Sequence, residues 1–210
     1  ASVWAAASKP TLVARFSILG DVARTLAGDR VQVSTLIGND QDAHTYQLRP
    51  SDVRTIRSAQ YVVLNGLGFE GAALRRAVRD SKVNFLDAAY GITPLKAAEE
   101  HDHDHHGHDH EHDHGEFDPH VWTNPANMLR YAENVAGALI LLDPAGKQYY
   151  GERLVQYQHQ LRELDKWTQA QFDTIPKAQR KVLTGHDAFS YMGQRYGIQF
   201  IAPLGTSTEA

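Results

Sequence analysis

Strand-like and helix-like sequence patterns alternate four times within the first 90 residues, and this alternation strongly limits the folds open to the chain. Short apolar runs predict strands at residues 11–16, 31–37, 61–64 and 83–86. Between them, apolar residues recur every three or four positions, as at Ile18, Val22 and Leu26, which predicts helices. Successive parallel strands need such helical crossovers. The sequence therefore predicts an α/β fold with a parallel sheet covered by helices.

Two longer helical patterns follow in the second half of the chain. The first begins at Asn124–Pro125 and ends at Asp143–Pro144, residue pairs that are typical of helix boundaries. The second covers residues 145–174, and at 1.5 Å per residue it forms a rod of roughly 40 Å. A strand, a helix and a strand are then predicted between residues 181 and 202. A rod of that length is suited to joining two lobes.

We therefore predict two lobes with parallel sheets, joined by one long rigid helix. The second lobe is expected to be incomplete in this chain, because two strands and one helix cannot bury both faces of a sheet. The first eight residues are small and apolar, as in the remains of a signal peptide, which favours export. The expected divisions are a signal-peptide remnant or disordered terminus at 1–9, an N-terminal lobe at 10–143 with a His-rich loop at 99–117, a linker helix at 144–175, and the start of a truncated C-terminal lobe at 176–210.

Charge and composition exclude several classes of protein. The net charge is −4, but nine of the 25 acids lie between Glu99 and Asp118, where there is no Lys or Arg. The other 16 acids and all 21 bases make a mildly basic body, which gives no strong electrostatic argument for nucleic-acid binding. No apolar run is long enough for a membrane span. Because the chain has no cysteine, it contains no thiolate metal site, disulfide or redox motif.

Residues 101–114, with the sequence HDHDHHGHDHEHDH, are the most informative stretch for function. Imidazole is the commonest metal ligand in proteins, and the interleaved carboxylates lower the cost of holding a cation. Because ordering a flexible segment costs about 1 kcal/mol or more per residue, we expect weak binding of several ions, for capture or buffering. An expression tag or a solvated acidic linker is the alternative. The auxiliary metal-binding residues are His101, His103, His105, His106, His108, His110, His112 and His114.

Two motifs match enzymes by their letters alone. Residues 110–114 satisfy the H-E-x-x-H pattern of zinc proteases, but they lie in a biased run without the apolar face of a docked helix. Residues 66–71 satisfy the dinucleotide-binding pattern G-x-G-x-x-G. That fingerprint normally follows the first strand of its unit, whereas this one follows the third. A tight strand-to-helix turn that needs glycine is therefore the favoured interpretation.

Three histidines outside this run are candidate metal ligands. His44 and His186 each follow a predicted strand, and His120 comes shortly after the His-rich segment. Ligands of open parallel sheets bind beyond the carboxyl ends of the strands, so His44 and His186 could converge from facing lobes. For a lone histidine, an ordinary surface or core position is the alternative.

Five segments of the chain form a recognisable combination: residues 42–52 (DAHTYQLRPSD), 65–70 (NGLGFE), the His-rich run, 118–122 (DPHVW) and 185–189 (GHDAF). Together they resemble the ZnuA-like zinc receptors of bacterial ABC importers, in the same order and over nearly the whole chain. The resemblance implies two lobes joined by a rigid helix, with the metal in the cleft between them. It also implies small tilts of the lobes instead of a wide hinge motion.

The resemblance further implies a set of metal ligands. His44 and His120 match the ligands of the first lobe, and His186 matches the ligand of the second. Manganese-type relatives carry a carboxylate at the position of His186, and three neutral imidazoles suit Zn²⁺ better than Mn²⁺. The family's fourth ligand, an acidic residue, would lie beyond Ala210, or water would replace it. Some zinc receptors have Glu just before the first histidine, where this chain has Ala43.

The expected function is therefore non-enzymatic. We predict an exported, periplasmic monomer that captures Zn²⁺ and presents it to the permease of an ABC zinc importer, with a periplasmic zinc metallochaperone as a second partner. An extracytoplasmic zinc buffer, metallochaperone or adhesin is the main alternative. A three-His zinc hydrolase or lyase is a smaller one, since that arrangement also activates water, and Asp187 is its only candidate base.

Overall fold

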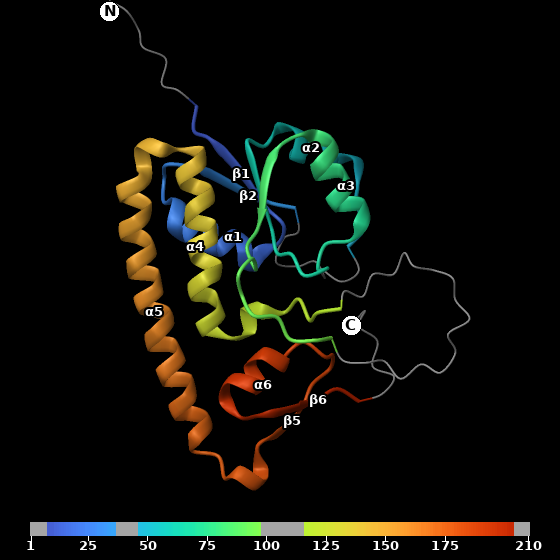
Figure 1. The fold of residues 1–210 in the computed structure, drawn as a ribbon, viewed down its shortest axis with the longest axis vertical. Helices are drawn as coiled ribbons and strands as arrows, with labels where there is room; N and C mark the ends of the chain where they lie inside the picture. The colour runs from blue at the N-terminus through green and yellow to red at the C-terminus, as the bar shows by residue number, and fades with distance from the viewer. Residues whose placement is uncertain (1–7, 37–45, 98–115, 204–210) are drawn as a thin grey trace, which may run out of the picture.

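A four-stranded parallel sheet lies at the centre of the larger part of the molecule (Figure 1). The structure is a computed structural model that describes residues 8–36, 46–97 and 116–203. All neighbouring strand pairs in the sheet are parallel, as the alternation predicts. The strands lie in the order β2-β1-β3-β4, and their bounds are β1 Thr11–Ala14, β2 Gln32–Thr35, β3 Tyr61–Leu64 and β4 Asn84–Asp87.

Helices cover both faces of this sheet. Successive side chains of a strand point to opposite faces, so each central strand contributes to two apolar layers. Leu12 and Ala14 of β1 belong to the cluster that contains residues of α1 and α4, whereas Val13 packs with residues of α2 and α3. The helices concerned are α1 Ser17–Ala27, α2 Pro50–Ser58, α3 Ala72–Ser81 and α4 Pro125–Leu142.

The turn between β3 and α3 contains the G-x-G-x-x-G sequence. Gly66 and Gly68 have positive φ angles of 89° and 76°, which glycine adopts at low cost. The Glu70 carboxylate accepts hydrogen bonds from the backbone N–H groups of Asn65 and Gly66, both at 2.8 Å. In a dinucleotide-binding turn, backbone amides are available to bind phosphate. Here two of them bind the protein's own carboxylate, which supports the interpretation as a strand-to-helix turn. After this turn, α3 begins at Ala72.

The long helix predicted over residues 145–174 forms as α5, Lys147–Asp173. Its 27 residues span about 40 Å. A short turn, η2 (Pro144–Gly146), connects it to α4, beside which it packs. Figure 1 shows that α5 runs back along α4, continues past the beginning of α4 and reaches the smaller part of the molecule.

Polar contacts hold the first half of α5 against the larger part of the molecule, which contains the four-stranded sheet. The Asp143 carboxylate accepts hydrogen bonds from Arg30 Nε at 2.8 Å and from the Tyr150 hydroxyl at 2.6 Å. Arg153 of α5 donates from Nε to the carbonyl oxygen of Thr25 in α1, at 2.8 Å. The start of the long helix is therefore fixed to the loop before β2 and to the end of α1.

The smaller part is a strand, a helix and a strand, as predicted. These elements are β5 (Lys181–Leu183), α6 (Ser190–Tyr196) and β6 (Gln199–Ile201), and the two strands pair in parallel. A short helical turn, η3 (Lys177–Gln179), lies between α5 and β5. The smaller part thus repeats the strand–helix–strand connection of the central sheet.

A short stem joins the chain on either side of the His-rich run. This stem consists of residues 95–97 and 116–118, which pair in antiparallel fashion, and the amide of Asp118 donates to the carbonyl of Leu95 at 2.8 Å. The predicted metal-binding run itself falls within residues 98–115, outside the described residues. The residues that flank this segment on either side therefore lie next to each other in the fold.

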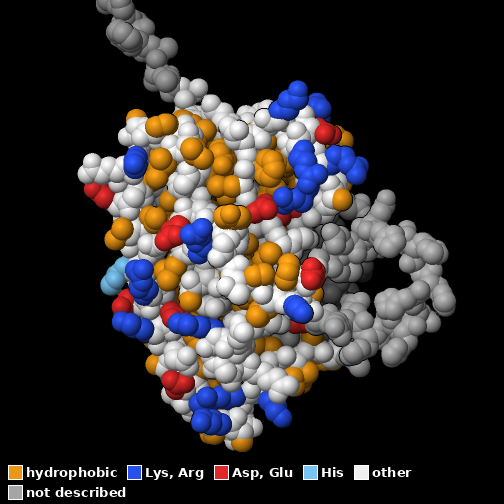
Figure 2. Space-filling model, viewed as in Figure 1, with side chains coloured by type: hydrophobic (Ala, Val, Ile, Leu, Met, Phe, Trp, Pro, Cys, Tyr) orange, Lys and Arg blue, Asp and Glu red, His pale blue; other side chains and the backbone are white. Residues whose placement is uncertain are grey.

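Basic side chains gather on one part of the visible surface. Figure 2 shows Lys and Arg atoms concentrated over α2 and α3, which carry the exposed Arg54, Arg57, Arg76 and Arg79. This agrees with the basic body that the charge count indicates. Among the described residues, no helix is both long and apolar enough to cross a bilayer.

We expect Asp143→Asn to make stability less sensitive to acid. The Arg30 guanidinium and the Tyr150 hydroxyl hold the pKa of Asp143 below its usual value. Such a carboxylate stabilises the fold above its unfolded pKa, and the contribution disappears as pH falls through the folded pKa. Urea denaturation between about pH 6 and pH 3 should show a smaller loss of unfolding free energy in the variant than in the wild type. An equal loss would contradict the role of Asp143, and Asp80→Asn on the exposed face of α3 is the control.

Candidate metal centre

His120 lies directly after the stem, and a carboxylate fixes its ring. Asp118 Oδ1 is 2.7 Å from His120 Nδ1 and also accepts a hydrogen bond from the backbone N–H of His120 at 2.9 Å. Both residues are buried, with His120 8% exposed and Asp118 7% exposed. A carboxylate partner keeps the imidazole proton on Nδ1 and the lone pair on Nε2. The arrangement is one that metal-binding histidines commonly have.

Aromatic rings form one side of the His120 environment. The Trp122 ring lies 5.2 Å from the His120 ring between centroids, and the Phe69 ring lies 6.4 Å away, both edge-on. Phe16 contacts both of these rings, at 5.0 Å from each. Such apolar surroundings limit the access of water and strengthen electrostatic interactions at the site.

The backbone just before His120 is held by a buried asparagine. Asn65, at the end of β3, donates from Nδ2 to the carbonyl oxygen of Pro119 at 3.0 Å. Its side-chain oxygen accepts a hydrogen bond from the Tyr131 hydroxyl of α4 at 2.9 Å. Asn65 is completely buried, so these bonds replace water that it cannot reach. The central sheet and α4 therefore both position the His120 segment.

A buried ion pair lies behind the aromatic side. Arg15, 2% exposed, has its Nε 4.0 Å from the Glu70 carboxylate, and its guanidinium lies over the rings of Tyr46 and Phe69, at 4.7 Å and 5.3 Å. Burial lowers the pKa of Arg15 and raises the pKa of Glu70, because each charge is removed from water. The Arg15 and Glu70 charges partly neutralise each other. Phe69 connects this ion pair to the site, because its ring lies under the Arg15 guanidinium and edge-on to the His120 ring.

His186 lies in the loop between β5 and α6, where it is half-buried. Its carbonyl oxygen accepts a hydrogen bond from the Thr184 hydroxyl at 3.0 Å. Five residues further on, the Tyr191 hydroxyl donates to the carbonyl oxygen of Asp118 at 2.5 Å. The segments that carry His120 and His186 therefore meet at one junction, between the central sheet and the β5–β6 pair.

The other predicted ligands cannot be placed in the same way. His44 and the eight auxiliary histidines lie outside the described residues. Within residues 8–36, 46–97 and 116–203, no three His, Cys, Asp or Glu side chains are grouped so that they could hold a metal ion. The set His44, His120 and His186 stays a prediction.

Sequence reasoning assigned no role to Asp118, Asn65 or Tyr191, although each shapes the site. Asp118 is two residues before a candidate ligand, and a carboxylate at that spacing was a usable signal. Asn65 directly follows a strand that is buried throughout, and a buried polar side chain there needs a partner. Tyr191 had no such signal, because its partners lie 73 and 96 positions away in the chain.

Removing the Asn65 side chain should destabilise the fold substantially. Asn65→Ala leaves the carbonyl of Pro119 and the hydroxyl of Tyr131 without their buried partner, and we expect a loss of about 3 kcal/mol of unfolding free energy. Urea denaturation followed by circular dichroism measures this loss. Asn84→Ala, at an exposed position of β4, should change stability by less than about 0.5 kcal/mol. Similar effects of the two substitutions would show that the buried network is unimportant.

Several transport proteins are similar in sequence to this chain. A manganese-binding lipoprotein, MntA, of Halalkalibacterium halodurans is 31% identical over 190 residues, which are 90% of this chain and 59% of that protein. The manganese ABC transporter substrate-binding lipoprotein PsaA of Streptococcus anginosus is 27% identical, over 96% of this chain and 64% of that protein. The iron ABC transporter substrate-binding lipoprotein MtsA of Streptococcus pyogenes serotype M1 is 28% identical, over 98% and 66%. The chain thus spans less than two thirds of the length of the first two relatives.

Solved structures and a family model agree with these relatives. A zinc-bound deletion mutant of ZnuA has a TM-score of 0.81 at 25% identity, over 97% of this chain and 74% of that one. A manganese-bound mutant of a periplasmic metal-binding protein of Candidatus Liberibacter asiaticus has a TM-score of 0.79 at 25% identity, over 96% and 71%. The model of the family described as zinc-uptake complex component A, periplasmic, matches residues 12–210. The chain therefore belongs to the ZnuA family.

Proposed function

We propose that this protein binds Zn²⁺ outside the cytoplasm and delivers it to the permease of an ABC importer. The names of the relatives support metal uptake through an ABC transporter, and the family description supports zinc. The predicted location agrees with a family described as periplasmic. In this function the protein is a receptor, and the metal ion is its cargo.

The observation that carries the proposal is the buried imidazole of His120 with its Asp118 partner. A carboxylate that binds Nδ1 fixes both the tautomer and the direction in which Nε2 presents its lone pair. His120 also lies two residues after Asp118, which contacts Tyr191 of α6, so a metal held by both His120 and His186 would join the two parts of the molecule. A ligand between two parts of a protein can be released when those parts separate, which is what delivery requires.

We assign the ion to His44, His120 and His186, with an acidic residue or water in the fourth position. Three imidazoles and one oxygen form a tetrahedral set that suits zinc, with Zn–N distances of about 2.0 to 2.1 Å. Manganese prefers more oxygen ligands. The relatives are named for manganese and iron, so the choice of zinc rests on the three histidines and on the family description.

The His-rich run is proposed as an accessory that collects ions close to the site. The residues that flank this segment pair in the stem, which ends at Asp118, two residues before His120. Ions held weakly by this segment would raise the local metal concentration near His120. The division into an N-terminal lobe, a linker helix and a C-terminal lobe is proposed with the same boundaries as those given by the sequence.

The proposed partner is the permease, and the protein is proposed to act as a monomer that can also receive metal from a metallochaperone. A zinc buffer or adhesin would bind the same ion without giving it to a permease. A hydrolase needs a base beside the metal, and Asp187, the sequence candidate for that base, is exposed in the loop between β5 and α6. No observation of the site favours catalysis over binding.

Zinc titration of the chelator-stripped whole protein tests the site. Competition with a chromophoric chelator gives the number and affinity of the sites in the wild type, in a deletion of residues 101–114, and in His120→Ala. We expect one tight site that survives the deletion. His120→Ala should weaken it at least about 100-fold, since loss of an outer-shell partner alone changes metal affinity 10- to 100-fold.

The matched control for this titration is His159→Ala, which removes an exposed histidine near the middle of α5. This variant should bind zinc as the wild type does. Tight binding that disappears with residues 101–114 and ignores His120→Ala would make the protein a His-loop chelator. The assignment of His44, His120 and His186 would then be wrong.

Metal preference is tested by competition between zinc and manganese. With equal total concentrations of both ions, we expect the loop-deleted protein to retain zinc, because neutral imidazoles bind Zn²⁺ in preference to Mn²⁺. The bound metal can be measured by atomic emission after gel filtration. His186→Asp should shift the balance toward manganese by adding a hard oxygen ligand. Preferential retention of manganese by the unmodified site would overturn the zinc assignment.

A further inference from the structure

One buried hydroxyl joins the small part of the molecule to the stem. Tyr191, in the first turn of α6, is 2% exposed. Its hydroxyl donates to the carbonyl oxygen of Asp118 at 2.5 Å and accepts from the backbone N–H of Leu95 at 3.0 Å. A hydroxyl that donates in one direction and accepts in another is fixed in position by both bonds. Tyr191 therefore bridges the two strands of the stem from a different part of the fold.

The residue that Tyr191 contacts is also the one that orients His120. The backbone carbonyl of Asp118 binds Tyr191, while its side chain binds the ring and the amide of His120. Tyr191 is also close in sequence to the second proposed ligand, because His186 lies five residues earlier, in the loop that leads into α6. A displacement of Tyr191 relative to Asp118 would thus change the separation of the two proposed ligands.

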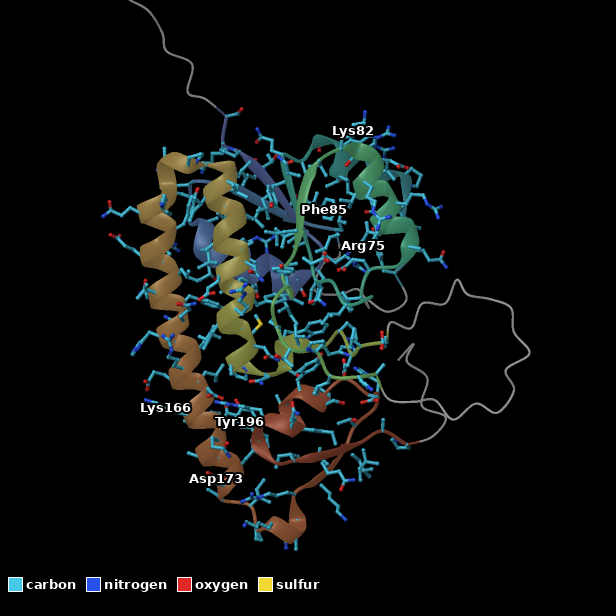
Figure 3. All side chains as sticks on the ribbon, in the orientation of Figure 1. Arg75, Lys82, Phe85, Lys166, Asp173 and Tyr196 are labelled. Carbon is cyan, nitrogen blue, oxygen red and sulfur yellow. The ribbon has the colours of Figure 1, made fainter. Side chains whose placement is uncertain are left out.

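The last residues of α6 are attached to α5 instead of the stem. Arg195 Nε donates to Asp165 Oδ1 at 3.1 Å, and the Tyr196 hydroxyl donates to the same oxygen at 2.8 Å. The Tyr196 ring also lies 5.4 Å from the Phe172 ring of α5. Figure 3 labels Tyr196 beside this helix, with Lys166 on the neighbouring turns of α5. The helix α6 therefore has one anchor on α5 and another on the stem.

We propose that Tyr191 is a positioning residue that sets the spacing between His120 and His186, and through it the affinity and the release rate of the metal. This inference rests on the proposed function. Ligands that are held in place before binding need little further ordering, whereas loosely held ligands must be ordered at the expense of affinity. The bridge is also the hydrogen-bonded contact that must break if α6 moves away from the stem during release.

The test compares Tyr191→Phe with Tyr196→Phe in the loop-deleted whole protein. Each change removes one buried or half-buried hydroxyl from α6 and keeps the ring, so both variants should fold. Tyr196→Phe loses its bond to α5 but leaves the bridge to the stem intact. Zinc affinity is measured by chelator competition, zinc release by stopped-flow transfer to an excess of chelator, and folding by thermal denaturation without metal.

We expect Tyr191→Phe to weaken zinc binding about five- to twentyfold, mainly through faster release, because two hydrogen bonds that hold the ligand spacing are lost. Tyr196→Phe should lower the melting temperature of the metal-free protein without changing zinc affinity. A purely structural role of Tyr191 would also lower the melting temperature, but it would leave affinity and release rate as in the wild type.

Two results would overturn the inference. Wild-type affinity and release in Tyr191→Phe would show that the bridge does not set the ligand spacing. Equal weakening in Tyr191→Phe and Tyr196→Phe would show a general effect of destabilising α6. His120→Ala in the same series separates this failure from failure of the proposed function: if His120→Ala leaves tight binding unchanged, the site itself is wrong, whatever Tyr191 does.

Discussion

The burial of Glu70 is the constraint on which the candidate site depends. Its carboxylate cannot reach water, so it takes the backbone N–H groups of Asn65 and Gly66, and it lies beside Arg15. This fixes the end of β3 in a turn that directs the Asn65 side chain across to Pro119. The segment that presents His120 is thereby tied to the centre of the sheet. A buried polar network of this kind is stable only when each member has a partner.

The long helix α5 gives the molecule a fixed frame. Asp143, Tyr150 and Arg153 hold its beginning to the sheet-containing part, and Asp165 holds its later turns to α6. The smaller part of the molecule is therefore attached to the same helix as the larger part. Both parts of the molecule are held to one continuous helix on either side of the junction near His120. The hydrogen bonds of Tyr191 close that junction from the other side.

The architecture was largely predictable from sequence, because hydrophobic periodicity is a local property. The four parallel strands, α4, α5 and the β5–α6–β6 unit all follow from spacing that is visible in short windows. Nothing in the local pattern reveals that the Glu70 carboxylate binds the backbone of the turn before α3. The G-x-G-x-x-G letters at residues 66–71 were interpreted as a strand-to-helix turn, and the structure agrees, because two backbone amides of this turn bind the Glu70 carboxylate. The candidate ligands were identified by residue type and resemblance, and their convergence on one metal stays a prediction.

The sequence by itself determined the parallel α/β architecture, the long connecting helix and the abundance of metal-binding side chains. Only the tertiary structure decided which ring nitrogen of His120 faces a carboxylate, and which distant residues hold that segment. The reason is that the contacts span large separations: Asn65 reaches Pro119 across 54 positions, and Tyr191 reaches Asp118 across 73. Local patterns specify helices and strands, whereas the orientation of a ligand depends on residues that meet only when the chain has folded.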